Sequence, residues 1–250
     1  MQINEKALRK LIFQSLRENN AEKIESLVSV AESKQYALCS FTQHGTTYAI
    51  LYDSPGLIKI VKEAIANGKF RSHNTFFLNA IPNRDIIIAG IAWGQDEDSG
   101  PCNGGQIVKT SAALDGSKMG PVVYEYALAT APGGLAPDRT SVSKYAQSVW
   151  KKYAERSGIE KKKFDNIKNP KTHDPSDDCL LTGSAALDQS YWTNNLSNSF
   201  STLLARHSDC MQTIRQEFET NRMSSFHVII KAEFIKGFTN LFDQVYMKNI

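Results

Sequence analysis

The chain has 250 residues, of which 41% are hydrophobic, and this is compatible with one large domain or two small ones around a buried core. Its 29 basic and 26 acidic residues leave a formal charge of +3, too small to indicate a dedicated nucleic-acid binder. No apolar run approaches the roughly 20 residues that a membrane-spanning helix needs. The charge scattered through residues 1–13 is unlike a signal peptide. We therefore expect a protein of a cytosol-like compartment, with no membrane association and no support for nucleic-acid binding.

The cysteines lie far apart in the sequence and form no short-spaced pair of the kind found in zinc or redox sites. They are Cys39, Cys102, Cys179 and Cys210. We expect four reduced thiols, most of them packed in the core. Cys179, with acidic residues and His173 nearby, is the alternative candidate for a nucleophile.

The first part of the chain alternates between helical and strand patterns. Apolar periodicity predicts two helices within residues 4–34, and two strands joined by a tight turn are predicted within residues 36–52. Ser54 and Pro55 then provide a cap and a first-turn proline for a helix that ends near Gly68.

Two further strand patterns follow, at residues 75–81 and 85–94. The second is apolar on both faces, which predicts a central strand. The acidic stretch at 94–105, rich in glycine and proline, predicts an exposed loop, and another strand begins at 106–114. This alternation predicts an α/β fold with a mixed sheet.

The most informative segment runs from strand 106–114 through the loop DGSKMGP at 115–121 into an apolar helix. Such a junction aims unpaired backbone N–H groups into the loop at the positive end of the helix dipole, which suits a phosphate group. Gly116 and Gly120 permit a close backbone approach, and Lys118 adds a positive charge. An ordinary strand-to-helix turn is the alternative interpretation.

A second helix is predicted within residues 141–158, capped by Ser141 or Ser143. Its apolar stripe follows the i, i+3, i+4, i+7 spacing that most often marks a face packed on the core. The stripe consists of Ala146, Val149, Trp150 and Tyr153.

These segments resemble the GNAT superfamily of N-acetyltransferases, and more closely the GNAT-like proteins of tailed bacteriophages. The resemblance covers roughly residues 106–215. It depends on the strings DGSKMGPVVYEYALA, GGLAPDRTSVSKYAQSVWKKYAERSG, DDCLLTGSAALDQSYW and LSNSF. It implies an acyl-CoA-dependent N-acyltransferase with a mixed sheet flanked by helices, found in the host cytoplasm or packaged in the virion.

The resemblance also implies a set of site residues. In the superfamily the loop and helix start bind the pyrophosphate of acetyl-CoA, and a tyrosine on a following helix protonates the leaving thiolate, for which Tyr153 is the match. The backbone of the preceding strand aligns the thioester. The implied cofactor-binding residues are Ser111, Ala112, Ala113, Asp115, Gly116, Ser117, Lys118, Met119, Gly120 and Pro121.

Two departures from the superfamily pattern leave a second function open. Asp115 stands at the first position of the loop, where an acid faces phosphate, and Lys118 replaces the inner glycine. Residues 131–139 contain no apolar run long enough for the usual fifth strand, which is therefore expected to be very short or missing. The alternative is a catalytically degenerate structural or interaction protein, either a virion component or a host-directed factor. A hydrolase that uses Cys179 or His207 is a distant third.

We expect a main domain at 36–215, with an N-terminal helical segment at 1–35 packed on it. An apolar segment at 216–250 completes the core or forms an interface with a protein partner or a second copy of the chain. The lysine-rich stretch at 160–171 predicts a solvated surface turn rather than a phosphate-binding patch. The acidic stretch at 173–179 has no recognised ligand spacing, so no metal is expected.

Overall fold

The computed structural model describes residues 23–66, 86–139, 142–156, 158–181, 189–192, 200 and 235–243. These residues belong to two compact units, each of which we describe by itself. The hairpin unit holds the described residues of 27–92, 110–126 and 200–243. The disulfide unit holds those of 23–26, 93–109 and 127–192.

The hairpin unit contains the predicted pair of adjacent strands. Strands β1 (Tyr36–Gln43) and β2 (Thr46–Asp53) pair antiparallel along their whole length. The two residues between them, His44 and Gly45, both have positive φ, 48° and 71°. Positive φ at both central positions is the requirement of the type I′ turn, whose twist matches that of the flanking strands. The predicted hairpin is therefore confirmed.

Two helices flank these strands. One covers residues 23–33, within the stretch for which helices are predicted. The other, α2 (Ser54–Ala66), follows β2 without a break. Asp53, not Ser54, caps it, because the Asp53 carboxylate accepts a hydrogen bond from the Gly56 N–H at 3.2 Å. The predicted cap is therefore wrong by one position, since Ser54 is already helical.

Strand β3 (Ile87–Gly94) is buried at every position, as its apolar sequence predicts. A Cβ atom on Gly90 would lie only 2.6 Å from the Phe238 ring, so the C-terminal helix over residues 235–243 packs directly on this strand. The buried apolar cluster of the hairpin unit comprises Ala37, Cys39, Phe41, Ile50, Tyr52, Leu57, Ile86, Ile87, Ala92, Ala112, Phe238 and Leu241.

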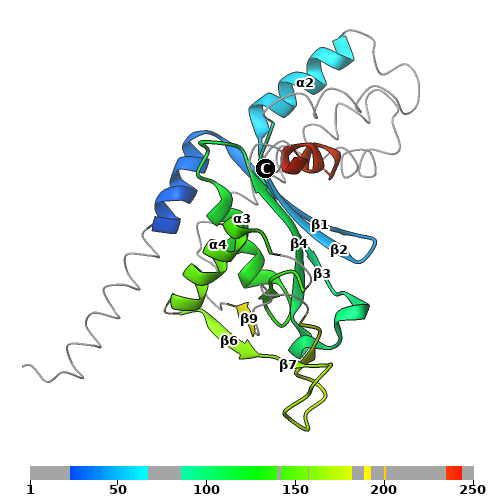
Figure 1. Cartoon of the computed structure of the whole chain (residues 1–250). Coiled ribbons are helices and arrows are strands. Elements are labelled where there is room, and N and C mark those ends of the chain that lie inside the picture. Colours follow the sequence, from blue (N-terminus) through cyan, green and yellow to red (C-terminus); the bar gives the residue numbers. More distant parts are fainter. Residues whose placement is uncertain are drawn as a thin grey trace, which may run out of the picture. The chain divides into compact units, whose positions relative to one another are not determined.

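The strands form a mixed sheet in the order β1-β2-β3-β4-β5-β9-β6, and all of these except β5 are labelled in Figure 1. Strand β4 (Gln106–Ala113) is the fourth of these seven, so the strand that leads into the 115–121 loop lies in the middle of the sheet. Strand β5 (Leu135–Ala136) has only two residues and pairs parallel with the start of β4. The α/β class and the short fifth strand are both as predicted.

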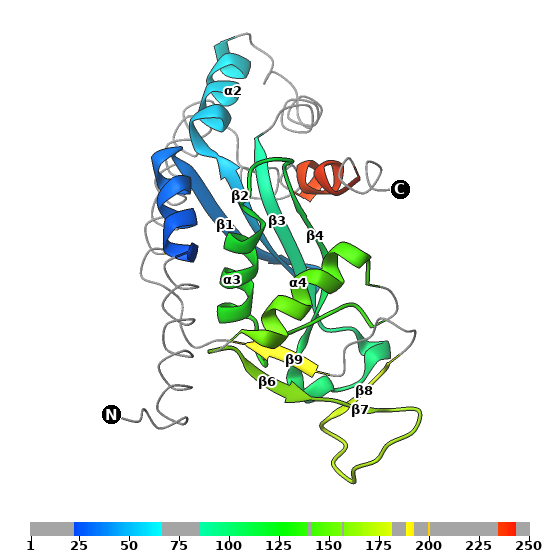
Figure 2. The same ribbon diagram turned by 60° about the vertical axis from the view of Figure 1, so that its left-hand side comes forward.

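The other end of the sheet lies in the disulfide unit. Strand β9 (Gln189–Trp192) pairs antiparallel with β5 and with β6 (Glu160–Lys163). Helix α4 (Lys144–Glu155) lies beside β9 in Figure 2, and the Trp150 ring stacks on Tyr191 at 5.3 Å between centroids. The predicted packing of α4 through Trp150, which is 1% exposed, is confirmed.

The two predicted helices beyond β4 are both present. Helix α3 (Gly120–Thr130) is buried over residues 122–128, and its largely apolar composition accounts for that burial except at Glu125, which is 5% exposed. In α4 the Ser143 hydroxyl accepts a hydrogen bond from the Ala146 N–H at 3.2 Å. Ser143 is thus the N-cap of α4.

The connection between β3 and β4 differs from the exposed loop that was predicted. It contains two short 3-10 turns, η2 (Glu97–Ser99) and η3 (Cys102–Gly104). Ser99 and Cys102 are each 1% exposed. The prediction is wrong for these two residues because the connection is bound to a distant segment of the chain.

That attachment is a disulfide between Cys102 and Cys179, which are separated by 77 positions. The expectation of four reduced thiols is therefore wrong for this pair. Cys179 lies in β8 (Asp178–Cys179), which pairs parallel with β7 (Asp165–Asn166) in a separate two-stranded sheet. Cys39 is buried in β1, and Cys210 lies outside the described residues.

Several predictions fall outside the described residues. They are the first helix within 4–34, the strand at 75–81, the helix end at Gly68, and His207. Within the part of the chain that the structure describes, no helix has the length and apolar character needed to cross a bilayer.

Candidate functional site

The junction between β4 and α3 is built as a tight loop in the hairpin unit. Leu114, at the end of β4, donates its backbone N–H to the Ile88 carbonyl at 2.8 Å, which fixes the loop entry to β3. The Ser117 N–H then bonds back to the Leu114 carbonyl at 3.0 Å. Gly116, with a φ of 73°, reverses the chain inside this turn. Glycine is therefore favoured at this position, because it adopts a positive φ without steric cost.

Internal contacts hold the second half of the loop. The Met119 N–H donates to the Ser117 hydroxyl at 3.3 Å, and the Val122 N–H donates to the Met119 carbonyl at 3.1 Å. The Met119 side chain is 1% exposed and anchors the loop to the core, whereas Lys118, with a φ of 59°, is exposed. These bonds engage the N–H groups of Ser117, Met119 and Val122 within the described loop, so an anion site here would use the N–H groups of Gly116, Lys118 and Gly120.

The loop residues differ in their exposure. Asp115, Gly116 and Lys118 are exposed, and Ser117 and Gly120 are half-buried. Pro121 occupies the first turn of α3, where its missing N–H costs nothing. The exposed positions thus put one acid, one base and one glycine on the outer face of the loop.

The three residues predicted to align a thioester form the end of β4. Ser111 and Ala113 are half-buried and Ala112 is 8% exposed. The Ser111 hydroxyl shares a hydrogen bond with the Tyr124 hydroxyl at 2.8 Å, which joins β4 to α3 immediately behind the loop. Sequence reasoning missed Tyr124, because its partner lies on a different element and nothing in the local pattern distinguishes it from other apolar positions of the helix.

Tyr153, the predicted proton donor, lies on α4 in the disulfide unit. It is 7% exposed, and its ring lies 6.3 Å from that of Trp150. The Arg156 guanidinium also approaches, with its carbon 6.0 Å from the centre of the Tyr153 ring. This residue therefore contributes to an aromatic packing cluster, and its role as a proton donor stays a prediction.

The acidic stretch after β6 brings together a different group from the one the sequence suggests. Asp165, Asp177 and Asp178 place carboxylate oxygens within 4.8 Å of one another. One Asp165 oxygen accepts backbone N–H groups from Lys171 and from Thr172, the latter at 2.6 Å. These N–H groups account for the position of the Asp165 carboxylate without any cation.

Hydrogen bonds also set the protonation behaviour of Asp165. The Thr172 N–H lowers the pKa of this carboxyl most strongly, burial acts in the opposite direction, and the Lys171 and Asn166 N–H groups add to the lowering. The pKa therefore lies below its ordinary value, and the carboxylate is ionised at neutral pH. Its structural role is to hold the segment between β7 and β8.

Two other sequence-based candidates have clear outcomes. Cys179 is not a nucleophile in this structure, because its sulfur is bonded to that of Cys102.

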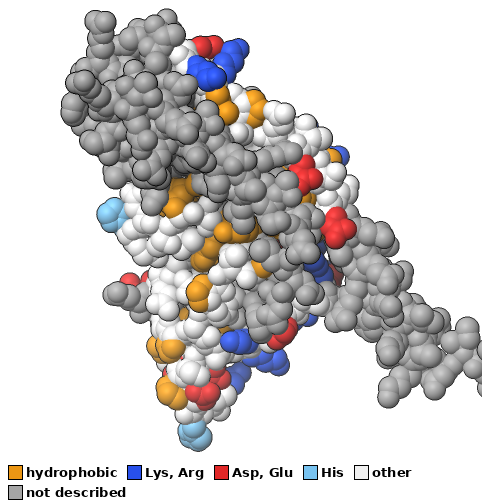
Figure 3. Space-filling view, turned by 180° about the vertical axis from the view of Figure 1, so that it is seen from behind, with side chains coloured by type: hydrophobic (Ala, Val, Ile, Leu, Met, Phe, Trp, Pro, Cys, Tyr) orange, Lys and Arg blue, Asp and Glu red, His pale blue; other side chains and the backbone are white. Residues whose placement is uncertain are grey.

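The lysine-rich stretch begins as the edge strand β6 rather than a turn, with Lys161, Lys162 and Lys163 all exposed. Figure 3 shows one face of the molecule, on which the described lysine and arginine side chains form small groups next to acidic ones. Lysines on an edge strand are a common protection against pairing with other chains.

Searches of family models, of curated proteins and of solved structures each find no match to this chain.

Proposed function

We propose that the chain is an acyl-CoA-dependent N-acyltransferase whose 115–121 loop holds the pyrophosphate of acetyl-CoA. The observation that carries the proposal is the conformation of this loop. It joins a central strand to a helix start and is turned by left-handed residues at Gly116 and Lys118. Backbone N–H groups at a helix start, together with the helix dipole, form a ready anion site. The resemblance to phage GNAT-like proteins gives this anion its identity.

In the proposed reaction an acceptor amine attacks the thioester carbonyl carbon of acetyl-CoA, and the carbon–sulfur bond breaks. The resemblance assigns the alignment of the thioester to the backbone of Ser111–Ala113 and the proton for the departing CoA thiolate to the Tyr153 hydroxyl. The attacking nitrogen loses one proton to solvent as the amide forms, and solvent returns a proton to the Tyr153 phenolate. The Ser111–Tyr124 hydrogen bond supports this arrangement, because it joins the strand that aligns the thioester to the helix whose N-terminus faces the phosphates.

Calorimetric titration of acetyl-CoA into the native chain and its variants tests the binding half of the proposal. Gly120→Val is the most informative change, because a Cβ there would meet only the Ala113 Cβ, at an ordinary 3.6 Å. We expect it to weaken binding more than Lys118→Ala, since the backbone supplies most of such a site. Thermal denaturation of each variant checks that the fold is kept.

Asp115→Gln gives a test of opposite sign. Removing an exposed acid beside pyrophosphate should strengthen binding by about 0.2–1 kcal/mol, because solvent screens the interaction. Absence of binding to the native chain and to all three variants would sink the acyl-CoA proposal.

The second candidate function is a structural or interaction protein that keeps the fold without the chemistry, as a virion component or a host-directed factor. The exposed Asp115 in the loop and the burial of Tyr153 favour it. Thiol release from acetyl-CoA, measured with lysine, spermidine and amine-terminated peptides as acceptors, separates the two functions. An enzyme loses this release in Tyr153→Phe while it still binds acetyl-CoA. A degenerate protein releases no thiol in either form.

A further inference from the structure

Two irregular segments of the disulfide unit lie against each other. One is the connection at 95–105, and the other is the segment at 164–180 that follows β6. Their backbones are joined by hydrogen bonds from the Asn103 N–H to the Ser176 carbonyl and from the Leu180 N–H to the Ser99 carbonyl, both at 2.7 Å. The two segments therefore form one local structure.

The disulfide supplies much of the buried material at this contact. Cys102 and Cys179 are 1% and 0% exposed, and the cluster around them adds Ile107, Ala136 and Phe164. So few apolar side chains bury little surface, and in such places covalent cross-links commonly replace a hydrophobic core. We expect the order of the 164–180 segment to depend on the disulfide more than on apolar burial.

The backbone at the disulfide is also held in an unfavourable conformation. Cys102 and Asn103 have φ values of 48° and 55°, in the left-handed region that residues with a Cβ seldom adopt. The Asn103 side chain is held in place by its amide, which donates to the Lys163 carbonyl at 2.6 Å. Breaking the sulfur–sulfur bond removes a constraint that holds this strained turn against the 164–180 segment.

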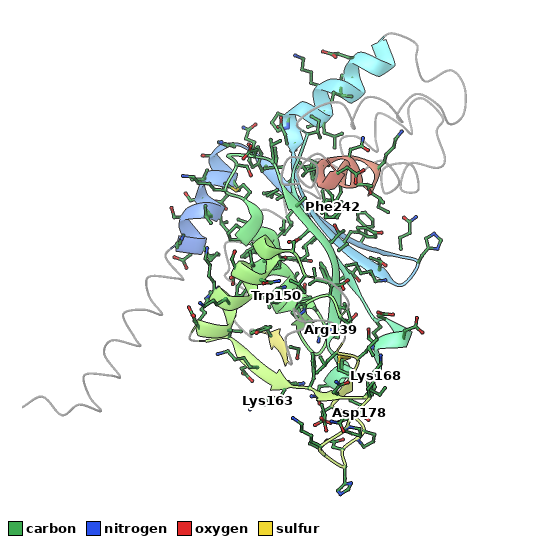
Figure 4. All side chains as sticks on the ribbon, in the orientation of Figure 1. Arg139, Trp150, Lys163, Lys168, Asp178 and Phe242 are labelled. Carbon is green, nitrogen blue, oxygen red and sulfur yellow. A yellow bond between two sulfur atoms is a disulfide. The ribbon has the colours of Figure 1, made fainter. Side chains whose placement is uncertain are left out.

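Arg139 places a positive charge beside one of the two sulfurs. Its Nη1 lies 3.9 Å from the Cys179 Sγ, its guanidinium stacks over the Phe164 ring at 5.4 Å, and its Nε donates to the Pro137 carbonyl at 2.8 Å. Figure 4 shows Arg139 in the disulfide unit, together with Lys168 and Asp178 of the 164–180 segment. A neighbouring guanidinium stabilises a thiolate, so Cys179 is the better leaving group in thiol–disulfide exchange.

We propose that the Cys102–Cys179 disulfide is a redox-controlled clasp that holds the 164–180 segment on the 95–105 connection. A dithiol reductant opens it when local opening of the contact exposes the buried sulfurs: one reductant thiolate attacks the Cys102 sulfur, the sulfur–sulfur bond breaks, and Cys179 leaves as a thiolate. The second reductant thiolate resolves the mixed disulfide and frees Cys102. Two electrons pass from the dithiol to the cystine, and the protons lost by the two reductant thiols are taken up by the two cysteines. The hairpin unit keeps its structure throughout.

Limited proteolysis of the full-length chain tests the clasp, because Lys168 and Lys171 are exposed trypsin sites within the 164–180 segment. The oxidised protein is compared with protein treated with dithiothreitol without denaturant. Reduction should accelerate cleavage after these lysines by about tenfold, as expected for local opening of one segment. Cleavage after Lys59 and Lys62 of α2, in the hairpin unit, should be unchanged.

The double variant Cys102→Ser/Cys179→Ser should reproduce the reduced pattern with or without dithiothreitol. Cys39→Ala, which changes a cysteine outside the pair, should behave as the native chain does. Alkylation followed by mass mapping verifies the redox state of each cysteine in every sample.

Three results would overturn the proposal. One is alkylation of Cys102 and Cys179 in the purified chain before any reductant is added. Another is an unchanged rate of cleavage after Lys168 and Lys171 once both sulfurs are shown to be reduced. The third is cleavage that spreads equally to α2, because the disulfide would then support the whole fold rather than one segment. None of these readouts involves acetyl-CoA, so the clasp and the proposed acyltransferase function are tested separately.

Discussion

The apolar cluster of the hairpin unit and the contact between the 95–105 and 164–180 segments are stabilised by different means. The first draws side chains from the neighbouring strands β1 to β4, from α2 and from the C-terminal helix. The second has five clustered residues, two of which form the disulfide, and depends on hydrogen bonds between loop backbones.

The difference follows from the length of the elements. Strands β1, β2 and β3 have eight residues each and present continuous apolar faces, whereas β7 and β8 have two residues each. Elements of two residues have no face to bury, so a covalent link and buried hydrogen bonds stabilise the contact instead. Substitutions in the apolar cluster should therefore lower stability by leaving cavities. Substitutions at the contact between the 95–105 and 164–180 segments should instead act by changing backbone geometry or charge.

The largest effect is expected from Phe238→Ala in the apolar cluster. Phe238 is 1% exposed and rests on Gly90, so truncation leaves a cavity on β3 and should lower the free energy of unfolding by about 3–5 kcal/mol. Hydrogen exchange of peptides from β1–β3, read by mass spectrometry, measures the loss. Phe242→Ala is the matched control and should cost less, because Phe242 is only partly buried. Equal losses would contradict the assignment of Phe238 to the cluster.

Gly133→Ala should produce the next largest effect, in the disulfide unit. A Cβ there would clash with the Gly104 carbonyl oxygen, and the backbone φ is 67°. Gly158→Ala is the matched control, since Gly158 has a φ of 84° and an added Cβ would have nothing within 4 Å of it. The difference between the two variants isolates the clash, which should cost about 1–3 kcal/mol in denaturant unfolding. If the two variants unfold alike, the 95–105 connection does not pack on Gly133.

Acid should loosen the 164–180 segment through Asp165. Because the folded-state pKa of Asp165 is lowered, its contribution to stability is fully present above the unfolded value of about 3.9 and is lost as pH falls through the folded pKa. Hydrogen exchange of peptides covering 164–180, corrected for the intrinsic rate at each pH, should show this loss below about pH 4.

Asp165→Asn should remove that pH dependence and weaken the segment at neutral pH, because an amide presents only one acceptor oxygen to the Lys171, Thr172 and Asn166 N–H groups. Asp174→Asn is the control with a smaller effect, since Asp174 is exposed and its pKa is lowered chiefly by the Ser176 N–H. If the 164–180 segment of the Asp165→Asn variant still loosens in acid as it does in the native chain, a group other than Asp165 causes the pH dependence.

The sequence predicts what depends on neighbouring residues. The hairpin turn at His44–Gly45, the buried run of β3 and the start of α3 at Gly120 all follow from local spacing and backbone preference. The bounds of the 115–121 loop were predictable for the same reason, because glycine and proline mark both of its ends. The cap of α2 was missed by one residue, since Asp53 and Ser54 are both good caps and only the hydrogen bond decides between them.

The sequence does not predict contacts between distant segments. Cys102 and Cys179 are 77 positions apart, and nothing in either neighbourhood indicates the other. The hydrogen bond between Ser111 and Tyr124 is likewise not indicated by the residues around either partner. Nor does the sequence indicate that the Asp165 carboxylate accepts hydrogen bonds from N–H groups further along the chain. The sequence thus located the candidate loop but not the hydroxyl pair behind it.

The smallest expected effect concerns the loop itself, at Lys118. This residue has a φ of 59° and an exposed side chain, so its left-handed backbone costs free energy that glycine would not incur. Lys118→Gly should therefore raise the free energy of unfolding by about 0.5–1 kcal/mol relative to Lys118→Ala. Both variants lack the positive charge, so the difference between them in chemical denaturation reports the backbone alone. Acetyl-CoA titration should then show similarly weakened binding in both, because the amide of residue 118 keeps its direction while the ammonium group is lost. If Lys118→Gly is no more stable than Lys118→Ala, residue 118 is not left-handed in solution, and the loop does not present its amides as the acyl-CoA proposal requires.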